Sequence, residues 1–128
     1  MPPEAASRHS GKSVIVRNTT KGTELGDNVL LAGTGKTRNK GLLGRDGLEA
    51  GEGLWIRPCE AIHMFFMRFA IDAVFIDKKK RVTKIAANLK PWRLSASFRA
   101  HSVVELPAGT AQRTGTERGD QLEIVEAQ

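Results

Sequence analysis

The sequence predicts a mainly β protein, a compact sandwich, jelly roll or barrel with one or two short helices. Short apolar stretches recur along the chain with turn residues between them, and several alternate apolar and polar residues with the period of two typical of strands. Glycine is also plentiful, at 13 of 128 residues. This length suits one domain, which we place at residues 13–128 after a disordered N-terminal segment at residues 1–12 rich in Pro, Ala and Ser.

The first half of the chain contains several predicted extended segments. Val14–Val16 form the first. The turn signal Gly26–Asn28 is flanked by apolar residues, which predicts a hairpin or two short strands. Thr34 is the predicted cap of a short helix that ends at Gly44 or Gly47, and Leu54–Ile56 form a further strand after a glycine-rich turn.

The second half begins with the stretch CEAIHMFFMRFAIDAVFID, the most apolar part of the chain. It predicts a strand at Ile62–Met67, apolar on both faces, and another at Ile71–Ile76. The charged turn DKKKR and the strand at Val82–Ala87 complete the strongest hairpin signal, and the loop KPWRLSASFRA follows. Three elements complete the chain: a strand at Ser102–Leu106, a helical turn at Thr110–Gly115 and a last strand at Leu122–Glu126.

Composition bounds the compartment and the partners. The formal net charge of +6 favours an anionic partner, but the cations are spread along the chain, as on an ordinary solvated surface. The single cysteine excludes an internal disulfide, and the N-terminus has no apolar segment of the kind a secretory signal needs. We therefore expect a cytoplasmic protein with no membrane partner, unless a leader peptide has been removed. The sequence does not determine the oligomeric state.

Three motifs suggest a binding or catalytic site, but the spacing of their residues does not fit one. Gly35-Lys36-Thr37 resembles a phosphate loop, but Leu30 stands where that loop needs glycine. Cys59 and His63 are four apart, which separates them by about 13 Å in an extended chain. The histidines have no metal-ligand spacing, so we expect no metal and no cofactor.

Ionisable residues within apolar strands form the candidate site. His63, Asp72 and Glu105 each lie in or beside such a strand, where a charge is costly unless it is paired. With Arg68 they predict a polar cluster, either a structural network or a pocket that binds a small polar or anionic ligand or a protein partner. The predicted ligand-binding residues are His63, Arg68, Asp72, Glu105, Trp55 and Phe65, the last two as an apolar wall.

Two alternatives remain open, and the sequence does not decide whether the protein is an enzyme. One is a small hydrolase or lyase in which His63 is the general base and Asp72 orients it. The other is single-stranded nucleic-acid binding through Trp92 with its neighbouring arginines, such as Arg93 and Arg99. We rank nucleic acid behind a small ligand.

The chain resembles the family called domain of unknown function 192. The resemblance lies in GLLGRDGLEAGEGLWI, HMFFMRFAIDAVFID, the charged turn, VVELPAG and the Gly-Asp pair before the last strand, and covers about residues 25–126. Ala70 stands where the family often has Pro, and Phe66 where many members have Trp. The resemblance implies a compact β-rich domain with no established activity, often preceded by an export leader. It implies that the family's polar positions fall on His63, Arg68, Asp72 and Glu105.

Overall fold

The computed structural model describes residues 13–32, 42 and 45–127. Within them the chain is mainly β, as predicted. The elements are β1 (Ser13–Asn18), β2 (Thr23–Ala32), β3 (Glu52–Ile56), β4 (Ala61–His63), β5 (Ile71–Ile76), β6 (Val82–Leu89), β7 (Leu94–Ala96), β8 (Ser102–Pro107), α3 (Thr110–Thr114) and β9 (Leu122–Glu126).

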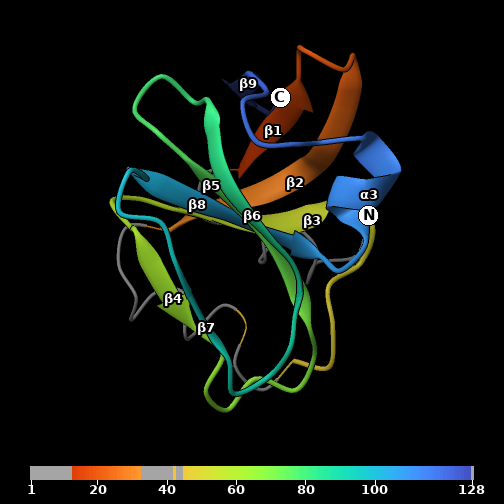
Figure 1. Ribbon diagram of the computed structural model, residues 1–128. Helices are drawn as coiled ribbons and strands as arrows, with labels where there is room; N and C mark the ends of the chain where they lie inside the picture. Colours follow the sequence, from red (N-terminus) through yellow and green to blue (C-terminus); the bar gives the residue numbers. More distant parts are fainter. Residues whose placement is uncertain (1–12, 33–41, 43–44, 128) are drawn as a thin grey trace.

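Seven of these strands form one curled sheet, in the order β6-β5-β8-β3-β2-β1-β9. Neighbouring strands of this sheet run antiparallel, except β2 and β3, which run parallel. The strands β4 and β7 pair with each other in a separate two-stranded sheet. Figure 1 shows this small sheet at the lower left and α3 at the right, on the other side of the large sheet.

The central strands are buried on both faces, so the large sheet has an apolar core on each side. Every residue of β5 and β3 is buried. Because side chains alternate along a strand, Val74 and Ile76 pack into one core, together with Leu106. Ala73 and Phe75 pack into the other. We call these the first core and the second core; Met64 and Met67, which follow β4, pack into the second.

The hairpin predicted around the charged turn is confirmed. β5 pairs antiparallel with β6, and the Asp77 carboxylate accepts the backbone N–H groups of Lys79 and Arg81 at 2.9 and 3.0 Å. The predicted strands at β1, β3, β8 and β9 and the helical turn at α3 are also confirmed. Gly115 ends α3 in the left-handed conformation that favours glycine.

The hairpin predicted at Gly26–Asn28 is wrong, because β2 is one continuous strand through these residues. The pairing of β1 with β2 shifts register there, and the N–H groups of Asp27 and Asn28 both donate to the Gly51 carbonyl, at 3.1 and 2.9 Å. A side chain at Gly26 would lie 2.9 Å from that same oxygen. The turn signal therefore marks a bulge and a close backbone approach, not a reversal.

The strand predicted at Ile62–Met67 is too long, because β4 ends at His63. The Met64 carbonyl accepts the N–H groups of Met67 and Trp92, at 3.2 and 2.8 Å, which closes a turn and ties it to the loop before β7. The segment KPWRLSASFRA, predicted as a loop, contains β7, a strand that the sequence pattern did not predict. Of the helix predicted from Thr34 to Gly44 or Gly47, the structure describes only Leu42 and residues 45–47, and residues 45–47 are not helical. Among the described residues, no helix is long and apolar enough to cross a membrane.

Candidate functional site

The predicted polar cluster is not assembled in the structure. Asp72 alternates with Ala73, so its side chain lies on the first-core face of β5. Glu105 pairs across the sheet with Ala73 and lies on the opposite face. His63 belongs to the small sheet, beside residues that pack into the second core. The three groups therefore do not share a pocket.

Asp72 has a structural role, because its carboxylate accepts hydrogen bonds from the backbone of neighbouring elements. Its side chain is 1% exposed. One carboxylate oxygen accepts the Asn88 N–H at 2.8 Å, and the other accepts the N–H groups of Gly109 and Ala111 at 3.2 and 2.8 Å. Asp72 thus joins β5 to β6 and to the start of α3, where Gly109 has no side chain to cap the helix. The general-base pair of His63 and Asp72 is therefore wrong, and so is a ligand contact by this carboxylate.

The other predicted site residues are also dispersed. Glu105 is fully buried, with 0% exposure. Trp55 packs into the first core and its indole N–H donates to the Ser102 hydroxyl at 2.9 Å, so it does not face Phe65 across a pocket. Arg68 lies on the surface and pairs with Asp46 at 3.3 Å.

Of the six predicted ligand-binding residues, the structure brings His63 and Phe65 together. Their rings stack with centroids 4.8 Å apart, and the Phe65 N–H donates to His63 Nδ1 at 3.3 Å. Trp92 continues the cluster, 5.8 Å from Phe65 and 4.8 Å from Phe66 between ring centroids. We call these four side chains the aromatic platform. Trp92 therefore packs with aromatic side chains of a turn that is distant in sequence. The nucleic-acid surface expected from Trp92 and its neighbouring arginines stays a prediction.

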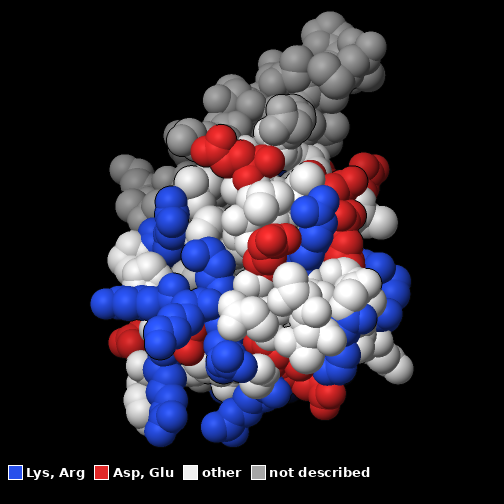
Figure 2. Space-filling view, turned by 90° about the horizontal axis from the view of Figure 1, so that it is seen from above, with Lys and Arg blue, Asp and Glu red and all other residues white. Residues whose placement is uncertain are grey.

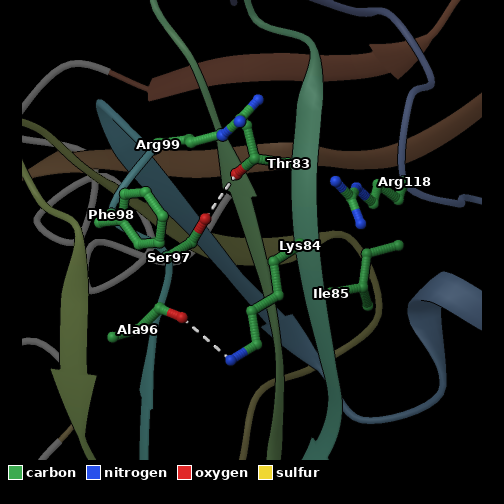
Figure 3. A pocket seen from close by; sticks show the side chains of 8 residues that line it. All are labelled: Thr83, Lys84, Ile85, Ala96, Ser97, Phe98, Arg99 and Arg118. Carbon is green, nitrogen blue, oxygen red and sulfur yellow. Dashed lines mark hydrogen bonds between the residues drawn. The ribbon is translucent and has the colours of Figure 1, made fainter.

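A second feature is an open hollow between β6 and the segment that follows β7. Its volume is about 670 Å³. Figure 3 shows two hydrogen bonds in this hollow. The Lys84 ammonium donates to the Ala96 carbonyl at 2.9 Å, and the hydroxyls of Thr83 and Ser97 are hydrogen-bonded to each other at 3.0 Å. We call it the basic hollow; its lining is Thr83, Lys84, Ile85, Ala96, Ser97, Phe98, Arg99 and Arg118.

The charged side chains that line the basic hollow are all cations. Lys84, Arg99 and Arg118 line it together with no carboxylate. Within the part of the chain that the structure describes, neither arginine is paired with an acidic side chain. The signal was present in the sequence, since residues 78–104 contain eight Lys and Arg and no Asp or Glu. Figure 2 shows the largest group of Lys and Arg at the lower left of the face seen from above, with a few Asp and Glu beside it and further Lys and Arg elsewhere on this face.

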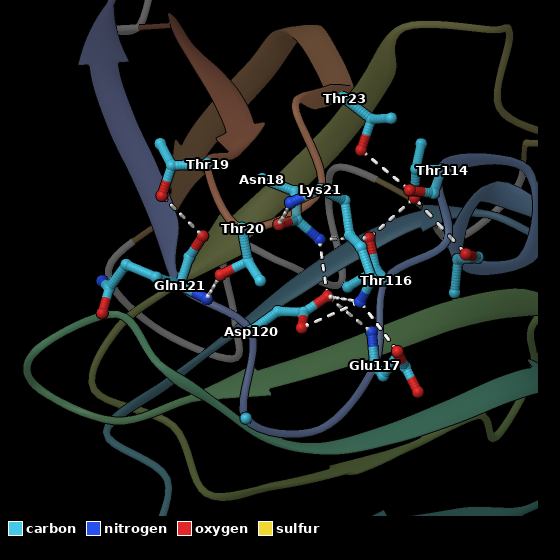
Figure 4. Close-up of polar contacts among 12 residues, drawn as sticks. Asn18, Thr19, Thr20, Lys21, Thr23, Thr114, Thr116, Glu117, Asp120 and Gln121 are labelled. Carbon is cyan, nitrogen blue, oxygen red and sulfur yellow. Dashed lines mark hydrogen bonds and ion pairs between the residues drawn. The ribbon is translucent and has the colours of Figure 1, made fainter.

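A buried polar network near the turn between β1 and β2 stabilises the fold (Figure 4). The Asn18 amide donates to Thr116 Oγ1 and Asp120 Oδ2, at 3.1 and 2.9 Å. The Lys21 ammonium contacts Asp120 Oδ2 at 2.9 Å and Glu117 Oε2 at 2.8 Å. Burial alone would raise the pKa of Asp120, but the hydrogen bonds from Asn18 and Lys21 hold it below its ordinary value. Hydrogen bonds to Glu117 and Asp120 raise the pKa of Lys21.

No group of three His, Cys, Asp or Glu side chains among the described residues is placed to hold a metal ion. The basic hollow and the aromatic platform both present charged or aromatic side chains to solvent.

The comparison with protein families agrees with the resemblance read from the sequence. The family model DUF192, described as an uncharacterized ACR, matches residues 16–124. The chain belongs to the DUF192 family. A UPF0127 protein of Pyrococcus furiosus is 35% identical over 112 residues, which cover 83% of this chain and 94% of that protein.

Two solved structures share the fold of this DUF192 protein. One is a "putative transcription regulator" from Sinorhizobium meliloti, with a TM-score of 0.74 and 26% identity over 88% of this chain and 92% of that one. The other is a protein of unknown function from Novosphingobium aromaticivorans, with a TM-score of 0.71 and 28% identity over 87% and 83% of the two chains.

Proposed function

We propose that this DUF192 protein is a binding module whose basic hollow takes a small anionic ligand. The observation that carries the proposal is the lining itself, in which Lys84, Arg99 and Arg118 meet without a carboxylate. A volume of about 670 Å³ lies within the range of small-molecule sites. The hollow is open to solvent, which suits a ligand that is held mainly through one charged group.

The lining supplies complementary contacts for such a group. Arginine presents a planar fork of donors that matches phosphate or carboxylate oxygens, and two arginines can hold an anion from different directions. Lys84 uses one donor on the Ala96 carbonyl and keeps the others for a ligand. Phe98 is 87% exposed, so its ring face is free to stack on a flat ligand.

These contacts favour a phosphate-bearing molecule with a flat ring, such as a nucleotide. The solved neighbour described as a transcription regulator supports including nucleotides among the ligands, although the function in that description belongs to the neighbour. The site differs from the polar cluster that strand patterning predicted, and the proposed ligand narrows the predicted one, which was a small polar or anionic molecule or a protein partner.

Calorimetric titration with inorganic pyrophosphate and with AMP, at low salt, tests the proposal. The Arg99→Gln and Arg118→Gln variants should each weaken binding about tenfold or more, the loss expected for a charge-assisted hydrogen bond. Lys78→Gln, an exposed change in the β5–β6 turn, removes the same charge away from the hollow and should leave binding within about twofold. Equal effects in all three variants, or no binding of either probe, would contradict the proposal.

A further inference from the structure

We infer that the anionic ligand of the basic hollow is single-stranded nucleic acid, which continues along β7 to the aromatic platform. The inference rests on the proposed function and extends it from one charged group to a polymer. Its basis is that β7 joins two features of matching chemistry, cations at one end and exposed ring faces at the other.

The aromatic platform is open to solvent. Phe66 is 70% exposed and Trp92 is 59% exposed, although both are large apolar side chains that folding normally covers. Their ring centroids lie 4.8 Å apart, with an interplanar angle of 60°. Exposed aromatic faces in contact with one another are the surfaces on which unpaired bases stack.

The backbone holds these rings outward. Phe66 and Trp92 both have positive φ, at 66° and 70°, in the left-handed region that few non-glycine residues occupy. The Met64 N–H donates to the Arg93 carbonyl and the Trp92 N–H donates to the Met64 carbonyl, each at 2.8 Å. Two hydrogen-bonded turns therefore present the rings in a defined arrangement, as a preorganised binding surface requires.

The platform and the hollow lie on one continuous segment. Leu94, the first residue of β7, pairs with His63 of the platform, and Ala96, the last residue of β7, lines the hollow. Trp92 and Phe98 are six positions apart in the sequence, a span of at most about 20 Å in an extended chain. Leu94, between them, is 67% exposed. A strand of a few nucleotides is long enough to reach both features.

The charge along this segment suits a phosphate backbone. Lys90 and Arg93 flank Trp92, and Arg99 follows Phe98. They belong to the run of residues 78–104 that holds eight cations and no acid. Bases in a duplex are already stacked on one another, so ring faces of this kind favour a single strand.

Fluorescence anisotropy with end-labelled 12-nucleotide oligoadenylate tests the inference, with AMP titrated in parallel. We expect the oligomer to bind more tightly than AMP. Trp92→Ala should weaken oligomer binding roughly 5- to 100-fold, the effect of one stacked base, while Trp92→Phe, which keeps a ring face, should retain most of it. Arg99→Gln should reduce the salt dependence, lowering the magnitude of the slope of log K against log salt by about 0.7.

A second readout separates stacking from any effect on folding. The protein has two tryptophans, and Trp55 is buried. In Trp55→Phe the emission comes from Trp92 alone, and oligoadenylate should quench it. Phe66→Ala should weaken the binding of the oligomer and leave the binding of AMP unchanged, since Phe66 does not line the hollow.

The outcomes distinguish the inference from the proposed function. If AMP binding needs Arg99 and Arg118 while the oligomer binds no more tightly and Trp92→Ala has no effect, the inference fails and the proposed function stands. If neither probe binds, both fail. Exposed aromatic and basic side chains also suit an anionic membrane surface. Binding to phosphatidylserine vesicles that depends on Trp92, with no oligomer binding, would overturn the inference as well.

Discussion

Replacing Asp72 with alanine removes the acceptor shared by three backbone N–H groups. The change should destabilise the fold without altering the basic hollow, because Asp72 does not line it. Of the three donors, Ala111 N–H is buried, whereas those of Asn88 and Gly109 are partly buried. The cost therefore depends on how well water can replace the carboxylate at each of them.

The magnitude follows from these three contacts. A hydrogen bond to a charged acceptor contributes about 1.5–3 kcal/mol, and stranding a buried donor has a similar cost. We assign about 2 kcal/mol to Ala111 N–H and about 0.5–1 kcal/mol to each partly hydrated donor, which totals about 3–4 kcal/mol. Asp72→Asn keeps one acceptor oxygen and should lose about half of that free energy.

Urea unfolding followed by far-UV circular dichroism measures this loss. With a slope of about 1–3 kcal/mol per molar urea, the midpoint should fall by about 1–4 M in Asp72→Ala. Asp46→Asn is the control, since the contact of Asp46 with Arg68 is exposed and its loss should change stability by less than about 0.5 kcal/mol. An Asp72→Ala protein as stable as the control would refute the structural role of this carboxylate.

Two further predictions concern the fold. Because the pKa of Asp120 is lowered on folding, its contribution to the free energy of unfolding is present above the ordinary carboxyl value of 3.8 and is lost as pH falls through the lower, folded value. Thermal melts of wild type and Asp120→Asn should therefore converge in strong acid, and parallel curves would contradict this linkage. Lys21 has a raised pKa, so its contribution is complete below 10.5 and is lost as pH rises through the higher, folded value, a step that Lys21→Met should abolish. Gly53→Ala should cost about 1–3 kcal/mol by chemical denaturation, because its new methyl group would lie 2.6 Å from the Glu105 carbonyl oxygen; an unchanged midpoint would show that the sheet adapts freely.

Local patterns predicted the elements whose signals are complete within a short stretch. The Asp77 turn and the strands beside it form one hairpin, and all of its pairing information lies within neighbouring residues. The turn signal at Gly26–Asn28 failed because glycine followed by Asp and Asn suits a bulge as well as a reversal. The bulge is determined by the backbone of Gly51, which lies far along the chain and accepts hydrogen bonds from β2 at this position.

The candidate site depended even more on distant contacts. Alternation along β5 puts Asp72 and Ala73 on opposite faces, but it does not say which of them shares a face with Glu105. The register between β5 and β8 decides that, and it pairs Glu105 with Ala73. The aromatic platform and the basic hollow likewise combine segments that are 20 or more residues apart, such as Phe66 with Trp92 and Lys84 with Arg118.

The sequence by itself determined the β-rich class, most strand positions, the family and the excess of positive charge, because periodicity, turn chemistry and composition are local properties of the chain. Tertiary structure alone decided which ionisable groups became buried ties and which cations came to share a hollow. The physical reason is that strand register and the covering of each sheet face are set by the packing of the whole core, so one residue of slip would turn every side chain to the other face.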